Sequence, residues 1–460
     1  MASAKLLSSE ILRKCSQISE EWRPLEPKHA LSILSGLSQK RDLALARKAY
    51  VLVIESGLNP IGILTNHLIR LFSECGSLRE AEAIFCKAPN LSAYTWHAII
   101  SAHSTLGEPI KSLDLYNTMQ RTGVKPDKVV FVCVLKICSI LLDIENGRLI
   151  HNDIIRNIVE ADDIAQTSLI NMYVKCGYLE DAWKVFEESQ TRDLVMWGAI
   201  ISGYSEHEHP TVVLELFEKM LENGIHSDRV TFACALKACG NLNRIGQGNV
   251  LYHLILKQQD DTDIVVNSSI VDMYAKHGNL KEAKKVFNSM PSRDVISWSA
   301  IIRGYTEFGE EFLALEAYQN FLQEGLRPDA VMFLSVIKAC GGLSTVHLGM
   351  LVHDQIIKSG LESEVEITNT LISMYAKCRC LTYSIRVFER LRDHYNVISW
   401  DVMIAGYAHN GQANACLELF AKMQCLGVMP AGYTFSYVVK ACVETGTIDL
   451  GRKMHKCIVA

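Results

Sequence analysis

The chain has 460 residues, of which 49% are hydrophobic and only 10 are proline, so it contains ample apolar material for a folded core. Its apolar runs have the length of ordinary helices, and no membrane span is expected. The formal net charge is −5, without the excess of Lys and Arg that phosphate contacts normally bring. Global charge does not identify a partner, because a local surface can differ from the total.

Residues 1–26 lie outside the repeats described below. They contain several serines and basic side chains such as Arg13 and Lys14, a composition compatible with an organelle presequence. Acidic residues such as Glu10 are unusual in such a peptide. We therefore expect an N-terminal segment, 1–26, that is a candidate presequence.

From residue 27 onward the sequence repeats. The strings YTWHAIISAH, VMWGAIISGY, ISWSAIIRGY and ISWDVMIAGY recur at intervals of 101, 101 and 102 residues. Each block divides into pieces of 35, 35 and 31 residues, which in the second block are 194–228, 229–263 and 264–294. We count about eleven pieces in the array 27–460, the last of them incomplete. Such a period predicts a repeat architecture.

Each piece is predicted to form two helices. In 194–228, Trp197, Ile200, Ile201 and Tyr204 recur at i, i+3, i+4 and i+7, on one helical face. We expect an all-α fold, a right-handed α-solenoid superhelix of about eleven helix-turn-helix repeats whose first helices line the inner groove. Glycines stand where a left-handed residue would end the first helix. These are Gly76, Gly107, Gly177, Gly278, Gly309 and Gly411.

No constellation of residues indicates catalysis. The sequence has 15 cysteines, but most lie within the repeat pattern and indicate small buried thiols in a reducing compartment. His207, Glu208 and His209 occupy a turn, where polar residues are expected without a metal. Cys378 and Cys380 are too close in sequence for a tetrahedral zinc site. No phosphate loop or dinucleotide fingerprint is present. We expect no enzyme, metal, cofactor or small-molecule substrate.

The strings SLINMYVKCGYLEDAWKVF (168–186) and SIVDMYAKHGNLKEAKKVF (269–287), which alternate with WSAIIRGY and VIKACGGL, resemble the plant pentatricopeptide repeat proteins. The closest resemblance is to the subclass built from triplets of standard, long and short repeats, and it covers 27–460. Members of this subclass act mostly in plant mitochondria and plastids as binders of single-stranded RNA, commonly in cytidine-to-uridine editing. The resemblance implies a site-recognition factor for editing, located in the mitochondrion or alternatively the chloroplast. Its implied partners are single-stranded organellar RNA and editing-complex proteins or a separate deaminase.

The resemblance also implies which residues contact RNA. Single-stranded RNA exposes its base edges, so two or three side chains of a helical repeat can read one base. In the family, the residue that follows the aromatic position of the first helix pairs with the last residue of the repeat. The short repeats supply Asn66 with Ser92, Thr167 with Asp193, Ser268 with Asp294, and Asn369 with Asn396; the standard repeats supply His97 with Asp127, Gly198 with Asp228, Ser299 with Asp329, and Asp401 with Ala431.

By the family's rule, Thr or Ser with Asp favours guanine, and Asn with Asn or Ser favours a pyrimidine. The pairs that begin with His97, Gly198 and Asp401 have no assigned base. The long repeats carry apolar residues at the reading position, Val132, Ala233 and Leu334, and are expected to be spacers. The family's second position holds an apolar residue that flanks the base. It is occupied by Ile63, Tyr94, Val195, Val265, Ile296 and Ile398, whereas Glu366 departs from the pattern.

Two alternatives remain. Asn, Ser, Thr and Asp near the start of a helix commonly cap it, so capping could explain the same residues without RNA. At the level of the whole chain, the alternative is a protein-binding scaffold of the tetratricopeptide kind, also built of helical hairpins. That family has 34-residue repeats, which the alternation of 35, 35 and 31 does not fit.

Overall fold

The computed structural model describes residues 27–447, except 39–40, 59–61, 89–90, 157–162, 259–262 and 392–394, together with Arg452. The candidate presequence, 1–26, lies outside the described residues. Within them there are 25 α-helices and no strand, so the expected all-α repeat fold is confirmed. The estimate of about eleven repeats is too low, because the pieces between residues 27 and 431 each form a hairpin. Twelve hairpins run from α2/α3 to α24/α25, and α26 follows them.

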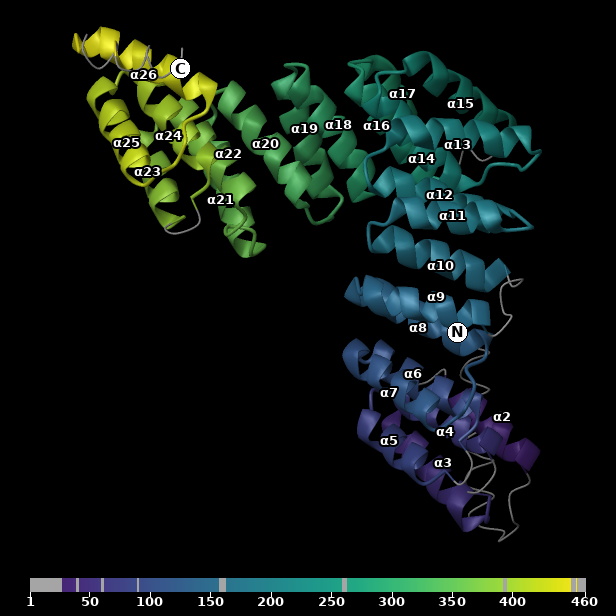
Figure 1. Cartoon of the computed structure of the whole chain (residues 1–460). Helices are drawn as coiled ribbons and strands as arrows, with labels where there is room; N and C mark the ends of the chain where they lie inside the picture. Colours follow the sequence, from purple (N-terminus) through teal and green to yellow (C-terminus); the bar gives the residue numbers. More distant parts are fainter. Residues whose placement is uncertain are drawn as a thin grey trace. The chain divides into compact units, whose positions relative to one another are not determined.

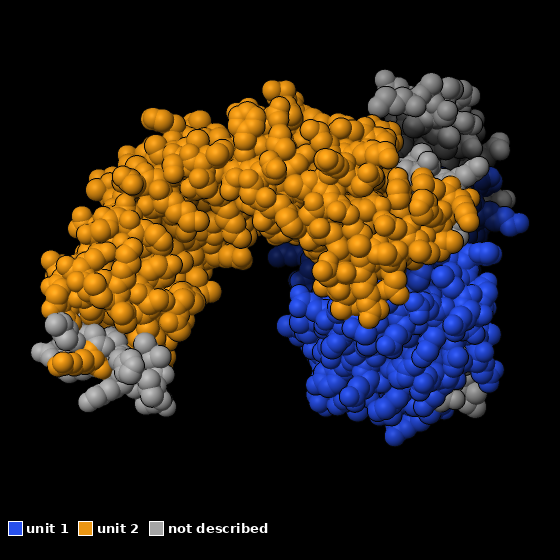
Figure 2. Space-filling view, turned by 90° about the horizontal axis from the view of Figure 1, so that it is seen from above, with its two compact units in different colours: residues 1–227 blue, residues 228–460 orange. Residues whose placement is uncertain are grey.

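The chain divides into two compact units, residues 1–227 and 228–460, which are coloured separately in Figure 2. Within each unit the first helix of one hairpin packs against the first helix of the next (Figure 1). The handedness of a superhelix over the whole chain stays a prediction. The first helices are α2 Pro27–Ser38, α4 Gly62–Glu74, α6 Ala93–Thr105, α8 Lys128–Leu141, α10 Asp163–Lys175 and α12 Leu194–Glu206 in the first unit, and α14 Arg229–Asn241, α16 Ile264–Lys276, α18 Val295–Glu307, α20 Ala330–Gly342, α22 Val365–Lys377, α24 Val397–His409 and α26 Gly432–Thr445 in the second.

The second helices cover one side of this layer. Each packs against the first helix of its own hairpin and, within a unit, against the next first helix, as α19 does with α18 and α20. Within a unit, a first helix therefore packs against neighbouring first helices along the layer and against second helices on one side of the layer. The second helices are α3 Leu43–Glu55, α5 Leu78–Cys86, α7 Pro109–Arg121, α9 Ile144–Arg156, α11 Leu179–Glu188, α13 Pro210–Glu222, α15 Ile245–Gln258, α17 Leu280–Ser289, α19 Glu311–Gln323, α21 Val346–Lys358, α23 Leu381–Arg390 and α25 Ala413–Cys425.

The four tryptophans that reveal the period share one packing role. Each is at most 5% exposed and meets, edge to face, the phenylalanine at the end of the preceding short repeat. Such aromatic pairs contribute about 0.5–1.5 kcal/mol beyond the burial of their area. They join successive hairpins at one point in every block. The ring centroids are 4.9 Å apart for Phe85 and Trp96, 4.7 Å for Phe186 and Trp197, 4.7 Å for Phe287 and Trp298, and 5.4 Å for Phe388 and Trp400.

The turn inside most hairpins requires a left-handed residue. All six glycines expected there have positive φ, from 69° at Gly411 to 87° at Gly107, which confirms the prediction. In six other hairpin turns a residue other than glycine has positive φ, between 51° and 60°. These residues are Arg41, Leu142, Glu208, Asn243, Ser344 and Arg379. A side chain in this conformation costs roughly 1–2 kcal/mol, so these six turns are strained relative to the turns that contain glycine.

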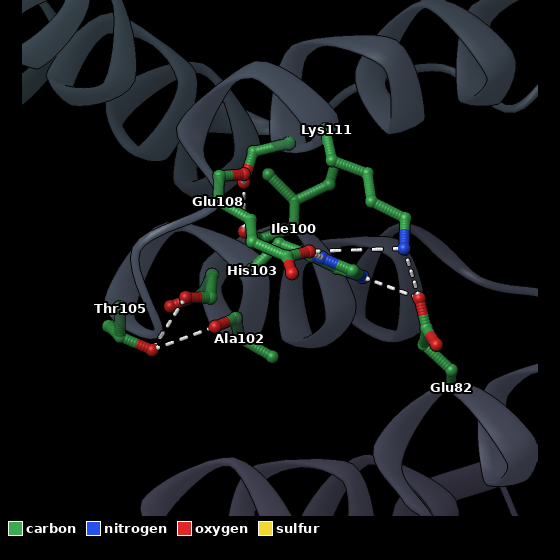
Figure 3. Close-up of polar contacts among 9 residues, drawn as sticks. Glu82, Ile100, Ala102, His103, Thr105, Glu108 and Lys111 are labelled. Carbon is green, nitrogen blue, oxygen red and sulfur yellow. Dashed lines mark hydrogen bonds and ion pairs between the residues drawn. The ribbon is translucent and has the colours of Figure 1, made fainter. Parts of the chain in front are cut away.

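A buried histidine connects two hairpins of the first unit (Figure 3). His103, near the end of α6, is 1% exposed and lies between two carboxylates. Its Nδ1 is 2.9 Å from Oε2 of Glu108, and its Nε2 is 3.3 Å from Oε1 of Glu82 on α5. Lys111 on α7 donates to the same Glu82 oxygen at 2.6 Å. The cluster thereby ties the turn of one repeat to the second helix of the repeat before it.

None of the helices in the described part of the chain has both the length and the apolar composition that a membrane span requires.

Candidate nucleic-acid interface

The first helices expose a row of apolar side chains. Residues at the second position of the short and standard repeats are 51% to 65% exposed, from Val265 to Val195. Glu366 is exposed as well. Ile164, which the sequence analysis did not single out, occupies the same position in its repeat and is 61% exposed. Its place as the second residue of the piece 163–193 was the signal that could have identified it.

The last residue of most repeats caps the first helix of the following repeat. Asp294, for example, has extended backbone angles, and its Oδ1 accepts a hydrogen bond from the backbone N of Ser297 at 2.8 Å. Ala431 has no side chain that can do this. The expectation that these residues could act as caps is thus correct for seven of the eight. The other caps are Ser92, Asp127, Asp193, Asp228, Asp329 and Asn396.

Three of the expected pairs are in direct contact, all in the second unit. The Ser268 hydroxyl donates to Oδ1 of Asp294 at 3.1 Å, and the Ser299 hydroxyl donates to Oδ1 of Asp329 at 3.2 Å. Asn369 donates from Nδ2 to Oδ1 of Asn396 at 3.3 Å. Capping and pairing therefore coexist in the same side chain.

In two of these caps, Asp294 and Asp329, one carboxylate oxygen has no hydrogen bond within the described residues. The cap and the partner hydroxyl both use Oδ1, and within the described residues no hydrogen bond reaches Oδ2 of Asp294 or Asp329. The amide oxygens of Asn66 and Asn369 also lack a partner there, and these two atoms are buried. Buried polar atoms without partners are uncommon in folded proteins. Such atoms suit a position that a bound ligand completes.

The three pairs of the first unit, which are Asn66 with Ser92, His97 with Asp127, and Thr167 with Asp193, show no direct hydrogen bond within the described residues. The Thr167 hydroxyl donates to the carbonyl of Asp163 at 2.7 Å, one turn earlier in its own helix, while Asp193 caps α12. His97 is half-buried, and burial lowers its pKa while the nearby Asp127 carboxylate opposes that shift. The imidazole of His97 is therefore held towards its neutral form, with one donor and one acceptor nitrogen.

In the two remaining standard repeats, the expected residues do not form a pair of side chains that could read a base. Gly198 offers no side chain, and a Cβ placed there would meet nothing within 4 Å. Asp228 belongs to the second unit, where it caps α14. Asp401 is 1% exposed, and its carboxylate accepts hydrogen bonds from Tyr433, at 2.9 Å, and from Thr434. Its oxygens are therefore engaged inside the protein.

The residues that resemble metal ligands have other contacts. Nε2 of His207 lies 2.7 Å from the carbonyl oxygen of Val174, and Cys378 directs its Sγ towards the carbonyl of Cys340. No group of three or more His, Cys, Asp or Glu that could hold a metal ion occurs among the residues that the structure describes. Burial raises the pKa of Cys138 to about 12 and that of Cys239 to about 11, which suits packed rather than reactive thiols.

Comparison with known proteins decides the family. A model described as the PPR (pentatricopeptide) repeat matches residues 94–124, 167–194, 268–295 and 367–395, and one described as the PPR repeat family matches 192–241 and 395–444. A putative pentatricopeptide repeat-containing protein of Arabidopsis thaliana is 32% identical over 438 residues, which cover 93% of this chain and 77% of the relative. The chain belongs to the pentatricopeptide repeat family.

Other pentatricopeptide repeat relatives are longer. A mitochondrial protein of Arabidopsis thaliana is 31% identical over 93% of this chain but only 42% of its own length. A chloroplastic protein of the same plant is 29% identical over 92% of this chain and 52% of its own length. The chain thus spans about half the length of these two relatives.

Solved structures agree with the pentatricopeptide repeat fold. The crystal structure of PPR10 from maize matches with a TM-score of 0.64 and 15% identity, covering 98% of this chain and 71% of that chain. PPR10 in complex with an 18-nt psaJ RNA element matches with a TM-score of 0.69, 16% identity and the same coverage. At this identity the similarity establishes the shared fold.

Proposed function

We propose that this pentatricopeptide repeat chain binds single-stranded RNA in a sequence-specific manner, with paired side chains of its short and standard repeats addressing the bases. The observation that carries the proposal is the contact of Ser268 with Asp294 and of Ser299 with Asp329, in which the cap leaves one carboxylate oxygen free. A hydroxyl has a single proton, which rotation about its C–O bond can redirect from the protein to a base, so the pair can offer a donor beside the free carboxylate acceptor. That combination suits the edge of a nucleobase.

The exposed row of apolar side chains supports the same proposal. Bases of single-stranded RNA are unstacked and bind on apolar or aromatic side chains in many RNA-binding proteins. Residues such as Tyr94 and Ile296 stand one helical turn before the reading positions His97 and Ser299, and are well exposed. A base that contacts a reading pair would therefore also find an apolar surface beside it.

The family's rule then gives base preferences. The pairs Thr167 with Asp193, Ser268 with Asp294, and Ser299 with Asp329 are proposed to favour guanine. Asn66 with Ser92 and Asn369 with Asn396 are proposed to favour a pyrimidine. The repeats with His97, Gly198 and Asp401 have no proposed base, and the engaged carboxylate of Asp401 argues against direct readout there.

The biological role is proposed from relatives. Pentatricopeptide repeat relatives of Arabidopsis thaliana are named as mitochondrial and as chloroplastic, so an organellar RNA is the proposed partner, in the mitochondrion or alternatively the chloroplast. The alternation of 35, 35 and 31 residues favours the triplet subclass and a role in choosing sites for cytidine-to-uridine editing. Editing-complex proteins or a separate deaminase would then supply the chemistry.

Selection from a random RNA pool tests the proposal. We expect the chain to enrich a short single-stranded motif with guanine at the positions facing Ser268 and Ser299, and to bind it more tightly than a scrambled RNA. Enrichment of no motif, with weak and equal binding of all RNAs, would contradict sequence-specific binding. A protein-binding scaffold would give that result.

A further inference from the structure

A lysine recurs at one position of the long repeats. Lys136 on α8, Lys237 on α14, Lys338 on α20 and Lys440 on α26 are each the ninth residue of their repeat, at intervals of 101, 101 and 102 residues. All four are exposed. Within the described residues none of them forms an ion pair or a hydrogen bond. We call these four residues the long-repeat lysines.

The long-repeat lysines lie on the face of the first helices that neighbouring helices leave open. In α20, Lys338 is seven residues after Val331, close to two full helical turns, so the two side chains point the same way. Val331 is 44% exposed, and it occupies the second position of its repeat. The same relation holds for Val230, 42% exposed, and Lys237 in α14. The lysines therefore share the face that carries the exposed apolar row.

Most other cations on this face are neutralised. Arg70 is paired with Glu74 at 2.9 Å, and Lys175 with Glu206 at 2.7 Å. A single carboxylate, that of Asp272, pairs with both Lys276 and Arg303. Lys377 on α22 is a further exposed cation without an ion pair in the described part of the chain. The unpaired positive charge of the face is thus concentrated in the long repeats, despite the net charge of −5.

The long repeats also lack the groups that could read a base. Their reading positions hold Val132, Ala233 and Leu334, which neither donate nor accept hydrogen bonds. Within a block, the unpaired lysine therefore lies in the long repeat, whereas the base-reading side chains lie in the short and standard repeats.

We infer that the long repeats bind RNA through its phosphates, by means of the long-repeat lysines, while the short and standard repeats address the bases. The inference rests on the proposed RNA binding and specifies how the long repeats contribute to it. An ammonium group is a compact point charge on a flexible stem, suited to phosphate oxygens without regard to the base attached. The long repeats would then contribute affinity that is independent of sequence.

The test compares two variants with the same loss of charge. The first replaces the long-repeat lysines by glutamine: K136Q, K237Q, K338Q and K440Q together. The matched control is K48Q, K257Q, K281Q and K422Q, exposed lysines of α3, α15, α17 and α25. Both remove one charge from the first unit and three from the second. The probes are an RNA selected from a random pool by the wild-type chain and a scrambled version of it.

Affinity is measured by fluorescence anisotropy over a series of KCl concentrations, with helicity checked by circular dichroism. Each phosphate contact with a single strand contributes about 0.7 to the slope of log K against log salt, so the first variant should lose about 3 in slope. At about 0.15 M salt its affinity should fall roughly ten-fold or more, by the same factor for both RNAs. The control should match the wild type, and arginine at the four positions should restore the slope.

A slope equal to that of the control would overturn the inference while leaving RNA binding intact. A loss confined to the selected RNA would also overturn it, because the lysines would then contact bases. An unchanged RNA slope with lost binding of poly-glutamate would indicate an acidic protein partner instead. A wild-type chain that binds neither RNA would refute the proposed function, and the inference with it.

Discussion

Ser268 and Asp294, 26 residues apart in sequence, are joined by a 3.1 Å hydrogen bond between the first helix of one repeat and the cap of the next. The neighbouring Ser269 makes the same type of bond to its own helix as Ser268, to the carbonyl four residues back, but the structure gives it no contact with Asp294. The two serines are therefore a matched pair, of which only one can take part in the proposed base recognition.

Replacing Ser268 by asparagine should move the preference of this repeat from guanine towards uracil. The amide replaces a hydroxyl beside an unchanged carboxylate, and the family's rule assigns uracil to that combination. A good base contact contributes about 1–3 kcal/mol of discrimination, which is roughly five-fold to more than a hundred-fold in affinity. The measurement is the affinity for the selected RNA and for the same RNA with one guanine changed to uridine. Ser269→Asn should change neither, and equal binding by all three proteins would mean that Ser268 has only a structural role.

Glu208→Gly should stabilise the first unit by about 1 kcal/mol, because it removes a side chain from a left-handed turn residue. The reciprocal change Gly107→Glu, at the equivalent turn with φ of 87°, should destabilise by a similar amount. Urea unfolding followed by circular dichroism measures both. Destabilisation by Glu208→Gly would show that this side chain makes a favourable contribution larger than its backbone strain.

Two glycines of one helix should respond in opposite directions to alanine. A Cβ at Gly248 on α15 would overlap Sδ of Met273 on α16, whereas one at Gly246 would meet nothing within 4 Å. Gly248→Ala should therefore cost about 1–3 kcal/mol through overpacking. Gly246→Ala should stabilise by roughly 0.5–1 kcal/mol, since helical glycine is entropically unfavourable. If Gly248→Ala cost as much in a Met273→Ala background as in the wild-type background, the overlap would not be the cause.

The cluster in Figure 3 contains a buried contact and an exposed contact, whose contributions to stability can be compared. His103→Leu should destabilise the first unit by about 1–3 kcal/mol, because Glu82 and Glu108 lose their buried polar partner. Lys111→Gln removes only a pair between half-exposed side chains and should cost about 0–1 kcal/mol. Thermal and urea unfolding measure both, and equal losses would contradict the assignment of the larger role to the histidine.

Purified residues 1–460 should deaminate no cytidine in single-stranded RNA, with or without added zinc. Known nucleobase deaminases use zinc held by His and Cys with a glutamate as acid and base, and the described residues contain no comparable group. Sequencing of RNA after incubation, with a characterised deaminase as the positive control, is the measurement. Conversion by contaminant-free protein would show that the chain is itself an enzyme.

The period of the sequence predicted the helical hairpins and the turn glycines because both depend on local patterns that every repeat restates. Contacts between repeats were harder to predict. The Thr167 hydroxyl has a backbone carbonyl of its own helix within reach, and its bond to Asp163 instead of Asp193 depends on a rotamer that no sequence pattern encodes. Similarly, the burial of Asp401 depends on Tyr433 and Thr434, which come from the following repeat.

The repeats are not independent modules, because the residue that ends one of them starts the helix of the next. Asp329 belongs by sequence to the repeat of Ser299, yet its Oδ1 holds the backbone N of Met332 at 2.8 Å. If the repeat that ends at Asp329 were replaced by a repeat from elsewhere, the new last residue would change both the base preference of that repeat and the cap of the helix that begins at Ala330. A donor repeat that ends in alanine, as the one ending at Ala431 does, would leave its new neighbour uncapped, at a cost of about 1 kcal/mol. Engineered arrays of this chain should therefore vary the residue within the first helix and keep the acidic junction constant.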